Sequence, residues 1–192
     1  MQALGLDEVW WLVSPGNPLK PTAGMAPLAA RLGSAIGQAR GSRIRPTAIE
    51  RDLGTRFTLD TLRGLRRRYP KVRFIWLMGS DNLAQFHHWK AWRDVARTMP
   101  IAVIARPGYD GAAFASPAGV WLGRFRRPPA SLRTRAGWSA PALIYLRFDP
   151  DPRSATALRA AEPDWASRPH FNRVGRHIRD PLTHHPIASD IK

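Results

Sequence analysis

The chain has 192 residues, of which 44% are hydrophobic, and its 30 basic and 14 acidic residues give a formal net charge of +16. This length fits one domain with a sizeable core, and the hydrophobic share argues against wholesale disorder. The absence of cysteine excludes disulfides and thiolate metal sites, and no apolar run approaches the roughly 20 residues of a membrane-spanning helix. These features predict a cytoplasmic protein that does not contact a membrane.

The basic excess has two interpretations. It could mark a nucleic-acid-binding module that binds through its arginines and lysines. It could equally reflect an arginine-rich proteome together with a site for anionic nucleotides. Because the arginines are spread along the whole chain, we favour the second interpretation and expect no specific nucleic-acid partner.

The N-terminal part is predicted to contain two strands and two helices. An apolar strand over 9–13 is followed by a loop with prolines and a glycine, and alanine, leucine and arginine favour a helix over 25–40. Residues 44–49 are expected to form an edge strand, since Pro46 cannot donate to a β-ladder. A leucine stripe opposite several arginines predicts a helix over 58–68, with its first residue as the N-cap.

The rest of the chain continues the alternation of strands and helices. In chain order we expect a buried strand at 72–78, helical turns at 81–86 and 89–99, a strand at 101–105, a variable insertion at 110–141, a last strand at 142–146 and a helix at 154–161. This alternation predicts right-handed crossovers and a parallel sheet, hence a Rossmann-like α/β domain. We place that domain at 1–162 and expect a basic, irregular tail at 163–192.

The buried central strand runs into residues that are typical of a ligand site. Gly79 lets the backbone come close to a ligand. Asp81 follows at the carboxyl end of the strand, where open α/β sheets bind ligands and a carboxylate can hold ribose hydroxyls. Asp81 could instead cap the helix that follows. Trp89 offers a flat face for stacking an aromatic ring, whereas we expect Trp92 to pack in the core and His87 to make a local hydrogen bond.

A second group of candidate ligand contacts lies at the start of the predicted helix at 154–161. Ser154 and Thr156 would place hydroxyls and free backbone N–H groups at the positive end of the helix dipole, where phosphate binds well. Arg159, one turn further, could pair with phosphate oxygens in bidentate fashion. An ordinary capped helix is the alternative interpretation.

Residues 79–89, Gly-Ser-Asp-Asn-Leu-Ala-Gln-Phe-His-His-Trp, resemble the Gly-x-Asp-Asn-Leu-x-x-Phe-His-x-Trp pattern of the bacterial nicotinate-nucleotide adenylyltransferases. Further segments are similar to that family in the right order, at 5–20, at 49–50 with 57–62, at 103–109 and at 152–159. In this comparison 49–50 would end the family's third strand. Together the segments cover about residues 4 to 160.

The resemblance implies transfer of an adenylyl group from ATP to nicotinate mononucleotide with Mg²⁺, giving deamido-NAD and pyrophosphate without a covalent enzyme intermediate. It implies ATP or phosphate contacts for Gly79, Asp81, Arg106, Ser154, Thr156 and Arg159, and nicotinate-nucleotide contacts for Asn17, Lys20, Thr58 and Trp89. The chain departs from the family in carrying Ala155 where a second serine is usual, so one hydroxyl contact of the phosphate motif is in doubt.

The family's opening strand, glycine-rich turn and His-x-Gly-His motif do not occur in the 192 residues. We therefore expect a family enzyme that lacks its first strand, has no assigned catalytic residue and turns over slowly. In the strand order 3-2-1-4-5, strand 1 lies between strands 2 and 4, here 9–13 and 72–78, so the middle of the sheet would be missing. Because unpaired buried backbone groups are costly, we expect this chain alone to be poorly soluble or partly folded.

Several alternatives stay open. The acceptor could be another molecule such as pantetheine phosphate, although the aromatic and histidine cluster at 86–89 favours nicotinate, and a non-catalytic nucleic-acid-binding module is the rival class. A homo-oligomer is compatible with the sequence. We expect no metal site, because His87 and His88 are adjacent and would diverge on a helix, and we expect His184 and His185 in the tail to be inert.

Overall fold

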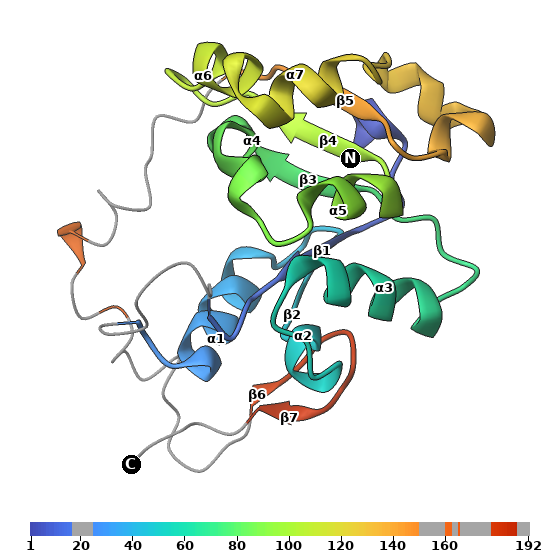
Figure 1. The fold of residues 1–192 in the computed structure, drawn as a ribbon. Coiled ribbons are helices and arrows are strands. Elements are labelled where there is room, and N and C mark those ends of the chain that lie inside the picture. Colours follow the sequence, from blue (N-terminus) through green and yellow to red (C-terminus); the bar gives the residue numbers. More distant parts are fainter. Residues whose placement is uncertain (17–24, 150–159, 163–164, 166–177, 188–192) are drawn as a thin grey trace. The chain divides into compact units, whose positions relative to one another are not determined.

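The computed structural model describes residues 1–16, 25–149, 160–162, 165 and 178–187 (Figure 1). The chain divides into two compact units, the first made of Met1, Leu6–Arg56 and Pro152–Lys192, and the second of Gln2–Gly5 and Phe57–Asp151. Within the described residues parallel strands alternate with helices, which confirms the predicted α/β class. The strands of the described part outside the C-terminal hairpin form two parallel sheets, one in each unit.

In the first unit, strands β1 (Val9–Leu12) and β2 (Ile44–Thr47) pair in parallel. Helix α1 (Leu28–Gln38) connects them in the chain and buries its apolar stripe, with Leu32 fully buried. Among the described strands β2 pairs with β1 alone. Pro46 therefore lies in an edge strand, as predicted from its missing N–H.

The core of this unit is built from small and aliphatic side chains that come from distant parts of the sequence. Its buried members are Val13, Ala29, Leu32, Ala35, Ala48 and Ile187, with Leu28, Ile36 and Ile178 packed against them. Burial of apolar surface is the dominant favourable term in folding. The C-terminal residues in this set are therefore part of the unit's core.

A hairpin lies in the stretch expected to be irregular. Strands β6 (Ile178–Arg179) and β7 (Pro186–Ile187) pair antiparallel. Asp180 starts the turn between them, because its Oδ1 accepts from the backbone N–H groups two and three residues further on. The expectation of a wholly irregular tail is thus corrected for 178–187, while the domain boundary at 162 stays a prediction.

Two further expectations for this unit are corrected. Ile49 and Glu50 were expected to end a strand, but they begin helix α2 (Ile49–Asp52). The chain turns there because Thr47 Oγ1 accepts a hydrogen bond from Ile49 N at 3.1 Å. His185 was expected to be inert, yet its Nδ1 lies 2.9 Å from Asp52 Oδ2.

In the second unit, strands β3 (Trp76–Gly79), β4 (Ile101–Ile104) and β5 (Leu143–Leu146) form a parallel sheet in that order. The first three residues of the central strand β4 are fully buried, as is typical of parallel strands covered on both faces. Strand β3 begins later than the predicted start at 72, because its pairing begins where Trp76 N donates to Pro100 O.

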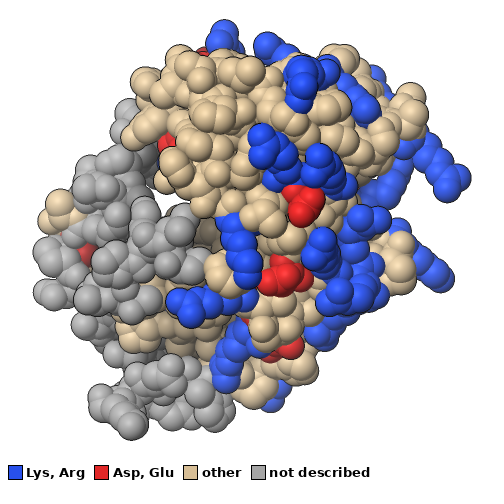
Figure 2. Space-filling view, in the orientation of Figure 1, with Lys and Arg blue, Asp and Glu red and all other residues tan. Residues whose placement is uncertain are grey.

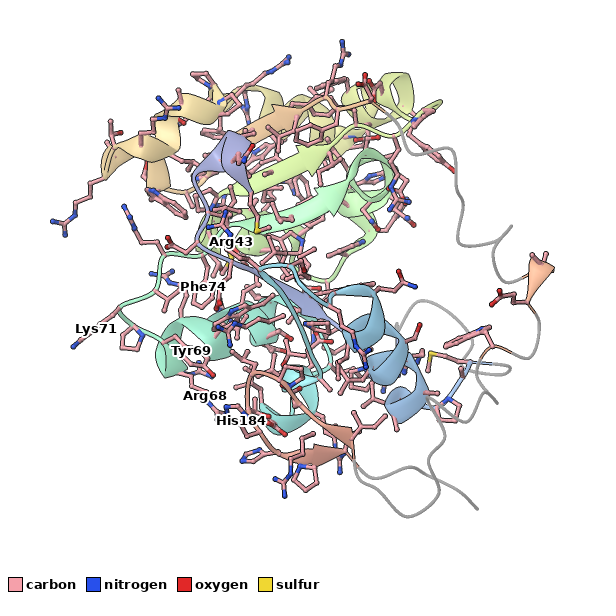
Figure 3. All side chains as sticks on the ribbon, turned by 180° about the vertical axis from the view of Figure 1, so that it is seen from behind. Arg43, Arg68, Tyr69, Lys71, Phe74 and His184 are labelled. Atoms are coloured by element: carbon pink, nitrogen blue, oxygen red, sulfur yellow. The ribbon has the colours of Figure 1, made fainter. Side chains whose placement is uncertain are left out.

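Helix α3 (Thr58–Arg68) coincides with its predicted span. Phe57 occupies the N-cap position without a side-chain hydrogen bond, so Thr58 is the first helical residue and not the cap. Tyr69 ends the helix, and its ring meets that of Phe74 edge-on with centroids 6.4 Å apart (Figure 3). The second unit also contains α4 (Ser80–Gln85), η2 (Phe86–His88), α5 (Trp92–Thr98) and η1 (Gln2–Leu4).

The stretch 110–141 is not the irregular insertion that its prolines and glycines indicated. It contains α6 (Asp110–Ala115), α7 (Pro117–Gly123), η3 (Pro129–Arg133) and η4 (Ala136–Trp138). Ser116 caps α7 by accepting from Gly119 N at 3.0 Å. A Cβ on Gly119 would collide with the backbone of α6, so α6 and α7 pack closely. Helices this short show too few turns for a clear 3.6-residue period.

The face of the described residues drawn in Figure 2 carries many basic side chains. In the view of Figure 2 lysines and arginines are spread widely, with acidic residues among them. This distribution agrees with the arginines scattered along the sequence. Across the described ranges, no helix is long and apolar enough to cross a membrane.

Candidate functional site

Three of the sequence-predicted ATP contacts come together at the carboxyl ends of β3 and β4. Gly79 ends β3, Asp81 lies in the first turn of α4, and Arg106 follows β4. Arg106 Nε lies 3.3 Å from Asp81 Oδ1, and its Nη1 donates to Asp81 Oδ2 at 3.4 Å. The backbone N–H of Arg106 also donates to Ser80 Oγ at 2.9 Å, which ties the loop after β4 to the start of α4.

Gly79 is required here by space and not by backbone conformation. Its φ of −80° and ψ of 161° are ordinary extended values. A Cβ at this position would collide with Asp81 Oδ1 and with Arg106 Nε. The glycine therefore makes room for the carboxylate–guanidinium pair, whereas the sequence alone had assigned that room to a ligand.

The Asp81 carboxylate keeps unused acceptor capacity. Its side chain is 24% exposed, and Oδ1 contacts Arg106 without accepting a hydrogen bond from the residues that the structure describes. Gly79 holds the N-cap position of α4 with no side-chain cap bond, so the capping alternative for Asp81 does not describe its place. Arg106 is 59% exposed, and its guanidinium has five donors, most of which point to no protein partner in the described part.

Sequence reasoning missed Tyr145, which lies on β5 beside this edge of the sheet. Its hydroxyl donates to Asp110 Oδ1, and Arg147 Nη2 lies 3.3 Å from Asp110 Oδ2. Burial raises the pKa of Tyr145, and the hydrogen bond to Asp110 raises it further while one to Ser80 opposes the shift. A tyrosine in an otherwise aliphatic buried strand was the available signal.

Trp89 lies at the end of η2 and is half-buried. Its ring meets Phe86 edge-on, with centroids 5.2 Å apart. Trp92 is buried and packs against both Phe86 and Trp121, at centroid distances of 5.9 and 5.4 Å. Trp92 is thus a core residue, as expected, whereas Trp89 is only half-buried.

The histidine expectations are corrected in part. His87 Nδ1 is buried and accepts or donates no hydrogen bond within the described residues, so the expected local bond is not formed at that atom. The rings of His87 and His88 lie 3.9 Å apart despite their adjacent positions, because side-chain rotamers can bring diverging Cβ directions together. The described part of the chain contains no group of three or more His, Cys, Asp or Glu arranged to hold a metal ion.

The remaining predicted contacts are not all within the described residues. Thr58 is half-buried at the start of α3. Asn17, Lys20, Ser154, Thr156 and Arg159 lie outside the described residues, and their roles stay predictions.

In the first unit, Arg31 fixes the loop that leads toward Asn17 and Lys20. Its Nη1 donates to Ser14 O at 2.6 Å, its Nη2 to Pro15 O at 3.3 Å, and its Nε to Ala26 O at 2.9 Å. Partial burial lowers the pKa of Arg31. No pattern in the sequence indicated this role, because Arg31 is one of many arginines spread along the chain.

A parallel α/β sheet with a carboxylate, an arginine and a close-fitting glycine at its carboxyl edge is the arrangement of a Rossmann-like nucleotide-binding protein. No protein-family model matches the chain. Curated relatives identify the particular family. A protein of Erythrobacter litoralis named a probable nicotinate-nucleotide adenylyltransferase is 67% identical over 190 residues, covering 99% of this chain and 85% of that relative.

Two more distant relatives carry the same name. One from Parvibaculum lavamentivorans is 49% identical over 159 residues, covering 83% of this chain and 79% of the relative. One from a Bradyrhizobium species is 44% identical over 167 residues, covering 87% of each. The chain belongs to the nicotinate-nucleotide adenylyltransferase family, which confirms the resemblance found in the motifs and does not favour the nucleic-acid-binding alternative.

Proposed function

We propose that this chain transfers the adenylyl group of ATP to nicotinate mononucleotide, giving deamido-NAD and pyrophosphate. The observation that carries the proposal is the Asp81–Arg106 pair beside Gly79 at the carboxyl edge of the second unit's sheet. This edge is where open α/β sheets bind nucleotides. The names of the curated relatives supply the reaction.

The reaction is a single displacement at phosphorus. A phosphate oxygen of nicotinate mononucleotide attacks the α-phosphorus of ATP, a new P–O bond forms, and the bond to the β-phosphate oxygen breaks so that pyrophosphate leaves with the electron pair. Such a step needs two aligned nucleotides and neutralised phosphate charge. It needs no covalent bond to the protein.

On the ATP side, the described residues offer complementary groups. The Asp81 side chain is 24% exposed, and its carboxylate has the chemistry to accept from a ribose hydroxyl. Arg106 is exposed enough to turn donors toward phosphate oxygens while it remains near Asp81. Ser154, Thr156 and Arg159 are proposed to hold the phosphates, on the strength of the motif at 152–159.

Mg²⁺ is proposed to arrive with ATP and to neutralise phosphate charge. In such sites the ion is usually held by substrate phosphates, waters and one or two carboxylates. The partly exposed carboxylate of Asp81 has this donor chemistry. A magnesium requirement is therefore part of the proposal.

On the acceptor side, the half-buried ring of Trp89 supports stacking of the nicotinate ring. Asn17, Lys20 and Thr58 are proposed to contact the rest of nicotinate mononucleotide. A cytoplasmic address and a homo-oligomeric state remain predictions.

The test is a panel of acceptors. Binding of nicotinate mononucleotide, nicotinamide mononucleotide and pantetheine phosphate is measured by calorimetry beside turnover with ATP. We expect nicotinate mononucleotide to bind most tightly, and Trp89→Ala to weaken that binding. Preference for pantetheine phosphate would reject the proposed acceptor.

A further inference from the structure

A hydrogen-bond network joins the three strands of the second unit's sheet at its carboxyl edge, where these strands lie side by side (Figure 1). Ser80 follows β3 directly and is fully buried. Arg106 lies just beyond β4, and its backbone N–H donates to Ser80 Oγ at 2.9 Å. Tyr145 lies on β5, and its hydroxyl is hydrogen-bonded to Ser80. The network therefore ends at the backbone of Arg106, one of the proposed ATP contacts.

The carboxylate of Asp110 gives this network one direction. Asp110 Oδ1 accepts from the Tyr145 hydroxyl, and Arg147 Nη2 lies 3.3 Å from Asp110 Oδ2. Because a carboxylate can only accept, the Tyr145 proton is used there, and the Tyr145 oxygen is left to accept from the Ser80 hydroxyl. A lone pair of Ser80 Oγ then faces the Arg106 N–H. Hydroxyls that donate and accept in one series strengthen one another.

Packing holds the Tyr145 ring beside this network. The ring lies against Phe114 of α6, with centroids 4.6 Å apart. Helix α6 begins at Asp110, so one helix supplies both the neighbour of the ring and the acceptor of its hydroxyl. A phenylalanine on β5 could make the same ring contact. The packing alone therefore does not require the hydroxyl, and the hydroxyl is explained by the network.

The backbone of Arg106 determines where its guanidinium can reach. The Arg106 side chain is 59% exposed and pairs with Asp81. Its backbone is held on both sides, by the bond to Ser80 Oγ and by Tyr109 N, which donates to Arg106 O at 3.2 Å. A long side chain loses conformational freedom when it binds a ligand, and a backbone that is already fixed reduces this cost.

We propose that Tyr145 is a positioning residue for ATP binding. Through Ser80 it fixes the backbone of Arg106, and it thereby keeps the guanidinium beside Asp81 at the carboxyl edge of β3 and β4. Tyr145 acts through Arg106 and not by contact with ATP. The inference rests on the proposed function, because the ATP contact of Arg106 is assigned there.

The test compares the same chemical change at two tyrosines. Tyr145→Phe keeps the ring and removes the hydroxyl. Tyr69→Phe is the matched control, because Tyr69 is also a half-buried tyrosine of the second unit. Tyr145→Phe is made in an Arg106→Ala background as well. Three readouts are taken on the full chain: calorimetric dissociation constants for ATP and for nicotinate mononucleotide, melting temperature, and amide exchange at Arg106.

We expect Tyr145→Phe to raise the dissociation constant for ATP by about fivefold or more, as for loss of one hydrogen bond, and to leave that for nicotinate mononucleotide within about twofold. Amide exchange at Arg106 should become faster. In the Arg106→Ala background the same change should alter ATP binding by less than about twofold, because the side chain through which Tyr145 acts is gone. Tyr69→Phe should leave the ratio of the two dissociation constants unchanged.

Three results would go against these statements, and they can be told apart. If Tyr145→Phe lowers the melting temperature but leaves the dissociation constant for ATP unchanged, the hydroxyl is only structural and the inference is overturned. If ATP binding weakens equally with and without the Arg106 side chain, Tyr145 does not act through Arg106, and the inference is again overturned. If the unaltered chain binds no ATP, the proposed function fails, and amide exchange then decides the network alone: unchanged exchange at Arg106 in Tyr145→Phe overturns it, and faster exchange supports it.

Discussion

Replacing Gly79 with alanine is expected to damage nucleotide binding more than folding. The new Cβ would collide with Asp81 Oδ1 and Arg106 Nε, both of which are side-chain atoms that can move. The side chains would therefore relieve the collision by giving up their ion pair. The backbone at Gly79 has an ordinary φ and would not be strained by alanine.

The expected loss of stability follows from the exposed fractions of the Arg106 and Asp81 side chains. Arg106 is 59% exposed, so losing its pair with Asp81 should cost only about 0–1 kcal/mol of stability. Asp81 is 24% exposed and must also shift, and overpacking a confined site costs typically about 1–3 kcal/mol. We expect the free energy of unfolding to fall by about 1–2 kcal/mol. ATP affinity should fall by about tenfold or more, since the displaced groups are its proposed contacts.

The assay pairs urea unfolding with calorimetric ATP binding. Gly123→Ala is the control, because a Cβ there meets no atom within 4 Å and alanine in a helix is favoured over glycine. The same Gly79→Ala change is also made in an Asp81→Ala/Arg106→Ala background. Contacting residues couple by about 0.5–3 kcal/mol, so the stability cost should nearly vanish there.

Two outcomes would refute this reasoning. An equal stability loss in both backgrounds would mean that the alanine collides with something other than the ion pair. Unchanged ATP affinity in Gly79→Ala, with the pair displaced, would mean that this edge of the sheet does not bind ATP.

The other predictions concern the second unit. Because burial and the bond to Asp110 raise the pKa of Tyr145, the neutral phenol stabilises the fold; this contribution is complete below the unfolded pKa of about 10 and is lost as pH rises through the higher folded value. Unfolding free energy measured from pH 8 to pH 12 should therefore fall less steeply in Tyr145→Phe, and identical slopes would contradict the assignment. Ser116→Ala should lower the free energy of unfolding in urea by about 0.5–2 kcal/mol, because it removes the cap of α7. Ser116→Asn should retain most of the stability that the cap contributes, because asparagine can also cap a helix. Trp92→Ala should cost about 3–5 kcal/mol, as for a buried aromatic core residue; Trp89→Ala should melt closer to the unaltered chain, and equal losses would remove the distinction between the two rings.

The elements that the sequence predicted well are those whose pattern is local. The leucine stripe of α3 has a helical period, and β4 is a short continuous apolar run. Both elements were placed within a residue of their bounds. The proximity of Asp81 and Arg106 could also be predicted, because parallel strands bring their carboxyl ends to one edge of the sheet. None of these predictions requires knowledge of a long-range contact.

What the sequence could not predict depends on long-range contacts. Strands β6 and β7 have two residues each, too few for any period. Their place is set by Asp180 meeting Thr47, residues far apart in the chain. The need for glycine at 79 was predicted but with a different reason, since the colliding atoms are the protein's own.

Detection of deamido-NAD is the most direct test of the account. The 192-residue chain is incubated with ATP, Mg²⁺ and nicotinate mononucleotide, and the dinucleotide is quantified by mass spectrometry against pyrophosphate released. We predict equal amounts of deamido-NAD and pyrophosphate, with much less of both in Asp81→Ala. Absence of deamido-NAD at any protein concentration, or an unchanged yield in Asp81→Ala, would contradict the assignment of this activity to the carboxyl edge of β3 and β4.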